Sequence, residues 1–148
     1  MMKENINEKL FVALCEFMIV TRKSVIRPLI TSYRPSISSL QFNVLLMLAF
    51  WGPESMSEIA NNMALSKQQM TQIIKKMDEA GLIRRTSDPL DGRRIIIELS
   101  DKGQELTNDI QARFLTSLKS RFDKADDAQL EQILASMKSL YTLLDMDE

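Results

Sequence analysis

The sequence has very few of the residues that most enzymes use for catalysis. Among 148 residues there is no histidine and one cysteine, Cys15. Without histidine, the commonest zinc sites and every histidine-based nucleophile relay are excluded. No paired acidic motif favours an enzyme that uses carboxylates alone. We therefore expect a protein that is not an enzyme and that needs neither a metal nor a cofactor.

A single cysteine cannot form an internal disulfide, which fits a reducing cytoplasm. Cys15 lies among apolar residues of an expected helix, which favours a buried, inert thiol over a redox sensor. The longest apolar run, Val44–Trp51, has eight residues, whereas a membrane-spanning helix needs about 20. No secretory signal is evident. These features predict a cytoplasmic protein that does not enter a membrane.

The composition is that of an ordinary globular chain, and its charges are unevenly distributed. Apolar residues make up 45% and charged residues 26% of a chain whose length suits one domain. The net charge is −1, but residues 66–94 carry seven basic and four acidic residues. Residues 122–148 carry seven acids and two lysines. A basic segment in the middle of the chain is typical of a protein that binds nucleic acid, whatever its net charge.

Helical periodicity dominates both ends of the chain. Apolar residues recur at steps of three and four over Ile6–Val25, which predicts a long first helix that Pro28 kinks or ends. A second helix is expected from Ser38, with Gln41 completing a capping box, to a stop at Gly52. Two further amphipathic helices are expected after Ser100 and after Asp126. The last could be core of one chain or an interface between two.

The middle of the chain has the pattern of a helix-turn-helix followed by a hairpin. Ser55 and Ser66 each open a capping box, and Gly81 ends the second of these two short helices. Residues 82–86 and 94–99 then read as strands around a turn over residues 88–92. A hairpin directly behind a recognition helix predicts a wing.

The wing residues resemble those of a known family. Asp91-Gly92-Arg93, five further residues and then Leu99-Ser100 look like the signature of the MarR (multiple antibiotic resistance regulator) winged-helix transcription factors. The run from Met77 to Arg85 is similar to that family's recognition-helix exit. The resemblance covers nearly the whole chain. It implies a mainly α fold with a small β-hairpin wing, as one domain over residues 1–148.

Within that domain, the resemblance implies dimerisation helices at residues 1–35 and 100–148, around a DNA-binding lobe at residues 36–99. It also implies an effector crevice between them. Four large side chains are candidates for lining that crevice, although each also fits a plain core. They are Phe17, Met18, Tyr33 and Trp51.

Residues near the two helix N-termini, on the outer face of the second helix and on the wing are candidate DNA contacts. They are Ser55, Ser66, Lys67, Gln68, Gln69, Thr71, Gln72, Lys75, Lys76, Asp91, Arg93 and Arg94. Helix N-termini offer N–H groups to phosphates. Glutamine suits adenine, the threonine methyl suits thymine, and the two lysines at positions 75 and 76 are placed for phosphates. Family members often have arginine where Gln72 stands, which removes a strong guanine contact.

Consecutive residues of a strand point to opposite sides, so Arg93 and Arg94 at the wing tip cannot both reach the minor groove equally. By resemblance, Arg93 reaches the minor groove while Asp91 pairs with an arginine and holds the tip. The alternative is that Arg93 and Arg94 merely solvate an exposed turn.

The sequence thus predicts a cytoplasmic, homodimeric repressor that binds a pseudo-palindromic operator in double-stranded DNA and is released by a small ligand. The alternative is a winged-helix module that binds another protein and has no specific operator. The basic stretch over residues 66–94 favours DNA.

Overall fold

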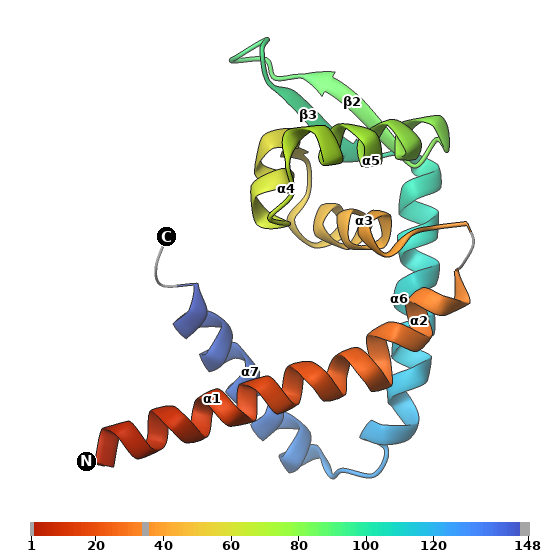
Figure 1. The fold of residues 1–148 in the computed structure, drawn as a ribbon. Helices are drawn as coiled ribbons and strands as arrows, with labels where there is room; N and C mark the ends of the chain where they lie inside the picture. The colour runs from red at the N-terminus through yellow and green to blue at the C-terminus, as the bar shows by residue number, and fades with distance from the viewer. Residues whose placement is uncertain (1, 34–35, 146–148) are drawn as a thin grey trace. The chain divides into compact units, whose positions relative to one another are not determined.

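The computed structural model describes residues 2–33 and 36–145, with side chains from residue 5 onward. Helices dominate, and one small sheet accompanies them (Figure 1). The chain forms two compact units, one up to Ala112 and one from Arg113, which are described separately. The elements are α1 (Met2–Thr21), η1 (Arg22–Ile26), α2 (Arg27–Ser32), α3 (Ser39–Trp51), β1 (Glu54–Ser55), α4 (Met56–Asn62), α5 (Lys67–Glu79), β2 (Ile83–Ser87), β3 (Ile95–Leu99), α6 (Asp101–Phe122) and α7 (Asp127–Leu144).

The first helix runs further than its apolar pattern predicts, and it changes its winding on the way. After α1, five residues form the π-helical segment η1, in which the backbone N–H of Arg27 donates to the carbonyl of Arg22. Pro28 follows at the second residue of α2 and does not end the helix. Proline lacks an N–H and so leaves a gap in the α-helical ladder, and the wider turn lies directly before it. The expected break at Arg34-Pro35 lies outside the described residues.

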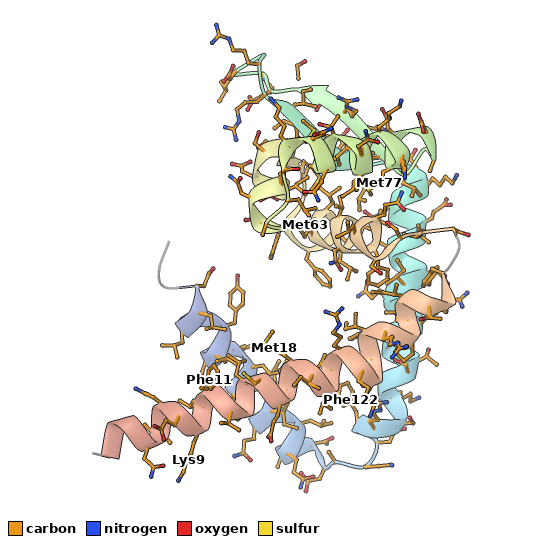
Figure 2. All side chains as sticks on the ribbon, viewed as in Figure 1. Lys9, Phe11, Met18, Met63, Met77 and Phe122 are labelled. Carbon is orange, nitrogen blue, oxygen red and sulfur yellow. The ribbon has the colours of Figure 1, made fainter. Side chains whose placement is uncertain are left out.

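The core of the first unit lies between α3, α4, α5 and the sheet. Ser38 and Gln41 form the expected capping box at the start of α3. Met70 and Met77 of α5 are fully buried, and Met63 is half-buried, as expected of methionines that fill a core (Figure 2). The fully buried large side chains of this core are Phe42, Leu45, Ile59, Met70, Ile74, Met77 and Ile97.

The expected hairpin is present, and it is part of a sheet of three strands. β2 and β3 pair antiparallel from Ile83 opposite Leu99 to Ser87 opposite Ile95. The two-residue strand β1 pairs with the other edge of β3, giving the order β1-β3-β2. Two residues are too few to show a period of two, so the sequence pattern does not reveal β1.

The end of α5 and the start of α6 are joined by side-chain hydrogen bonds. The Ser100 hydroxyl donates to the carbonyl of Gly81 at 2.6 Å and accepts from the N–H of Gly103 at 3.0 Å. Lys102 donates to the carbonyl of Ala80 at 2.8 Å. Gly81 has φ +71°, which confirms the left-handed residue expected there. This junction fixes the direction in which α6 leaves the lobe.

The helices at the two ends of the chain expose much apolar surface. Phe11 and Met18 project from α1 (Figure 2) and are 68% and 62% exposed. In the second unit, Asp126 and Gln129 form the expected capping box of α7. No residue of α7, all of which the structure describes, is buried. No helix in the described ranges is long and apolar enough to cross a membrane.

Candidate nucleic-acid interface

Helices α4 and α5 form the helix-turn-helix, and their capping boxes set where each begins. Ser55 pairs with Glu58 at the start of α4, and Ser66 pairs with Gln69 at the start of α5. Between them Ala64 has φ +51°, a left-handed conformation that alanine seldom adopts. The turn is therefore tight, and α5 begins directly after it, with the N-cap at Ser66.

The buried and exposed faces of α5 separate as the sequence predicts. Met70, Ile73, Ile74 and Met77 are buried, which leaves the polar side chains of the helix on the outside. All seven candidate contacts between Lys67 and Lys76 are exposed. An amphipathic helix of this kind presents one continuous polar face.

Two of these exposed side chains already have partners within the helix. The side-chain oxygen of Gln69 accepts from the N–H of Ser66 at 3.0 Å and from its hydroxyl at 2.9 Å. The Thr71 hydroxyl donates to the carbonyl of Lys67 at 2.7 Å. The side chains of Gln68 and Gln72 have no hydrogen-bond partner among the residues that the structure describes. Since they are four apart, they lie on one side of the helix with both amides turned outward.

The lysines of α5 also differ in whether their charges are already paired within the protein. Lys75 lies 3.8 Å from the carboxylate of Glu79 one turn along, so part of its charge is compensated. Lys67 and Lys76 have no ion pair with any described residue. Lysine is a compact point charge that suits a phosphate oxygen. Lys67 and Lys76 are therefore the better candidates for phosphate contacts on this face.

The wing tip is held by its own aspartates. The Asp88 carboxylate accepts from the N–H of Leu90 at 2.8 Å, and the Asp91 carboxylate accepts from the N–H of Arg93 at 3.0 Å. Asp91 thus holds the tip through the backbone of an arginine, and it makes no ion pair with the side chain of any described arginine. Both acids face the turn, which leaves Leu90, 98% exposed, and the Arg93 side chain to meet an approaching molecule.

Arg94 points elsewhere, to the start of α4. Its guanidinium lies 3.0 Å from Glu58 and 3.4 Å from the Ser55 hydroxyl. Ser55 is 2% exposed, and its hydroxyl donates to Glu58 at 2.6 Å. The Ser55 side chain is therefore committed inside the protein, and neither it nor the Arg94 guanidinium is free to bind a phosphate. Glu58 is the site residue that sequence reasoning missed, because a capping glutamate carries no sign of a distant arginine.

The two glutamates beside this cluster have opposite pKa shifts. Hydrogen bonds from Ser55, and then the charge of Arg94, hold the pKa of Glu58 below its ordinary value. Burial, and then the charge of Glu58, raise the pKa of Glu54. The start of α4 thus stabilises the charged form of Glu58 and disfavours the charged form of Glu54.

None of the four candidate effector residues lines a pocket found among the residues that the structure describes. Phe17 and Trp51 are 52% and 61% exposed, and Met18 is exposed on α1. The Tyr33 hydroxyl donates to Asp109 of α6 at 2.8 Å. A pocket of about 450 Å³ lies instead against η1, α2 and α3. It is lined by Arg22, Ile26, Arg27, Ile30, Thr31, Ser39 and Asn43.

Other kinds of site find little support. Within the described residues no group of three or more histidine, cysteine, aspartate or glutamate side chains is placed to hold a metal ion. Cys15 is half-buried on α1, which is more exposed than the buried thiol expected from the sequence.

The fold and the polar face of α5 are those of a winged helix-turn-helix, a class that includes regulators that bind DNA. The profile of the MarR family matches residues 37–95. The uncharacterized HTH-type transcriptional regulator YkoM of Bacillus subtilis is 26% identical over 98 residues, which are 66% of this chain and 64% of that protein. The HTH-type transcriptional repressor NicR of Pseudomonas putida is 31% identical over 72 residues, 49% of this chain and 46% of that protein.

A solved structure of a MarR family protein from Bacillus stearothermophilus has the same fold. Its TM-score is 0.77 at 19% identity, covering 97% of this chain and 98% of that one. The match of the MarR family over residues 37–95 agrees with the family that the wing signature resembles. The chain's relatives are named as transcriptional regulators, not as enzymes.

Proposed function

We propose that this protein is a homodimeric, cytoplasmic repressor that binds a pseudo-palindromic operator in double-stranded DNA and leaves it when a small ligand binds. The observation that carries the proposal is the outer face of α5. There Gln68 and Gln72 turn unengaged amides outward, and Lys76 lies one turn beyond them without an ion pair to any described residue. Arg93 adds an exposed cation at the wing tip.

Each group has a role that follows from its chemistry. Gln68 and Gln72 contact base edges in the major groove, with adenine as the best partner because a carboxamide matches its donor and acceptor. Lys67, Lys76 and the first N–H groups of α5 after Ser66 hold phosphates. Arg93 enters the minor groove, where narrow A·T-rich stretches concentrate negative potential. Gln69, Thr71 and Lys75, which have partners inside the protein, support this face.

Repression and dimerisation rest on different observations. NicR, a relative, is named a repressor, and a protein that occupies a promoter blocks transcription by exclusion. The exposed apolar side chains of α1, and separately those of α7, are available for contact with a second copy. Two copies related by a two-fold axis read two half-sites, so the operator is a pseudo-palindrome. The relatives YkoM and NicR are bacterial proteins. Bacterial DNA lies in the cytoplasm, so the proposed repressor is placed there as well.

The ligand that releases the repressor is a small organic anion. The pocket against η1, α2 and α3 has Arg22 and Arg27 in its lining. Neither guanidinium has an ion pair with a described residue. Arginine recognises carboxylates with two parallel hydrogen bonds, and a pocket of this volume admits a small molecule.

Selection of bound sequences from a pool of random duplexes tests the proposal. We expect one enriched pseudo-palindrome, bound in gel shift at least about 1,000-fold more tightly than random DNA at physiological salt. A module that binds only other proteins would enrich no sequence and would show no salt-dependent retention on heparin. That result would contradict the proposal.

A further inference from the structure

Arg94 connects the wing to the helix-turn-helix through three acceptors. Its Nη2 lies 3.0 Å from Glu58 Oε1 and 3.4 Å from Ser55 Oγ, and its Nε lies 4.0 Å from Asp88 Oδ2. Asp88 is on the other side of the wing turn, where its N–H donates to the carbonyl of Arg94 at 3.0 Å. The guanidinium therefore spans from the start of the wing turn to the first turn of α4.

The acid that receives Arg94 differs from its counterparts elsewhere in the chain. In the described residues, α3, α4, α5 and α7 each begin with a capping box. The third helical residue is Gln41 in α3, Gln69 in α5 and Gln129 in α7, but it is Glu58 in α4. Glutamine is therefore sufficient for the cap in this protein. The additional carboxylate oxygen of Glu58 is the one that meets Arg94, while Oε2 forms the cap.

We infer that Arg94 and Glu58 form a positioning pair that fixes the direction of the wing relative to α4 and α5. This inference rests on the proposed DNA binding and adds to it how the two contact elements are held. A two-stranded ribbon twists easily, and its pairing at one end leaves the tip free to swing. The pair fixes the end of the strands next to the wing turn before DNA arrives, so less conformational entropy is lost when the protein binds DNA. Arg93 then reaches the minor groove while Gln72 faces the major groove.

The test is a double-mutant cycle on DNA affinity with Glu58→Gln, Arg94→Gln and the double variant. Glu58→Gln keeps the cap, because one oxygen suffices for it, and removes the oxygen that meets Arg94. We expect each single variant to bind the selected operator about three- to tenfold more weakly than wild type. The double variant is expected to bind no more weakly than either single variant, because one interaction is lost in all three.

Salt dependence separates positioning from direct contact. In the matched control Arg93→Gln, we expect the slope of log affinity against log salt concentration to flatten by about 1, as for a lost phosphate or groove contact. In Arg94→Gln and Glu58→Gln we expect the wild-type slope. If Arg94→Gln flattens the slope and Glu58→Gln binds as well as or better than wild type, Arg94 is a DNA contact and the inference is overturned.

A measurement without DNA keeps this inference separate from the proposed function. Amide hydrogen exchange over residues 84–97 is expected to be faster in both variants than in wild type, while exchange within α5 stays the same. Unchanged exchange in the wing of both variants would overturn the positioning pair, even if wild type binds its operator. Faster exchange in a protein that binds no DNA would uphold the pair and contradict the proposed function.

Discussion

Gln69 shows how one side chain can be placed at a protein surface and still be committed. Its carbonyl oxygen closes the capping box with Ser66 and so supports the first turn of α5. Losing such a cap costs about 1 kcal/mol. In the proposed complex, Gln69 is therefore expected to act through the helix N-terminus that it stabilises, and base recognition is expected from Gln68 and Gln72.

Gln72 and Lys76 are one helical turn apart, and their replacement is expected to have different consequences. Gln72→Ala should cost about 1–3 kcal/mol on the best operator and relax the preference at one base position. Lys76→Ala should weaken all sequences about equally and lower the salt slope by about 1. Binding to a panel of operators with single base changes, at several salt concentrations, measures both. Identical profiles would contradict the assignment of the two roles.

Gly103 is a position where only a hydrogen fits. A Cβ there would lie 2.0 Å from the backbone carbonyl oxygen of Leu82. Gly103→Ala should therefore lower the free energy of unfolding by about 2 kcal/mol or more, although alanine favours helices. Urea unfolding at a fixed protein concentration measures this. Gly92→Ala is the matched control, since nothing lies within 4 Å of its Cβ position and its stability should be near wild type.

At the scale of elements, a single substitution in the wing tests its role in DNA binding. Arg93→Ala is expected to weaken operator binding at least tenfold, most at operators with A·T-rich flanks, because a cation leaves the narrow groove. The Arg93 side chain has no ion-pair partner among described residues, so the melting temperature should stay within about 1 °C of wild type. Wild-type affinity in this variant at physiological salt would remove the wing from the mechanism.

The junction of β1 and α4 predicts a pH dependence of stability. Burial and the neighbouring Glu58 raise the pKa of Glu54 above its unfolded value, so the native state binds its proton more tightly. The charged form therefore costs stability at neutral pH, and this cost disappears as the pH falls below the ordinary value of 4.5. Glu54→Gln should raise the urea midpoint at pH 7 and have no such effect at pH 4. An equal gain at both pH values would contradict this.

These elements also mark the limit of sequence reasoning. Capping residues and apolar periods are local, so α3, α4, α5, α7 and the hairpin could be predicted from residues within one or two turns. The ion pair between Arg94 and Glu58 joins positions 36 apart, and β1 acquires its hydrogen bonds from β3 across the sheet. Such contacts depend on the completed fold. The pocket against η1, α2 and α3 depends on the completed fold in the same way, because its lining comes from three elements.

At the scale of the whole molecule, the apolar faces of α1 and α7 predict assembly. α7 buries none of its residues within one chain, yet Ile133, Leu134 and Met137 are all apolar. An obligate dimer interface of this family's kind buries about 2,000 Å² or more. Sedimentation at micromolar concentration should show one species of about 34 kDa, twice the 17.0 kDa of the chain. A stable monomer under these conditions would contradict the dimer.

The π-helical segment η1 has a consequence for how the first helix evolves. A π turn holds one residue more than an α turn, and each residue of an α-helix advances the side-chain direction by about 100°. Deleting one residue within Arg22–Ile26 would restore regular winding and rotate the apolar stripe of α1 by about that angle relative to α2. The carbonyl that lacks a hydrogen bond because Pro28 has no N–H would then need another donor. A one-residue insertion or deletion at this point therefore rotates α1 about its axis. It changes the direction in which the apolar face of α1 points, while every side chain on that face stays the same.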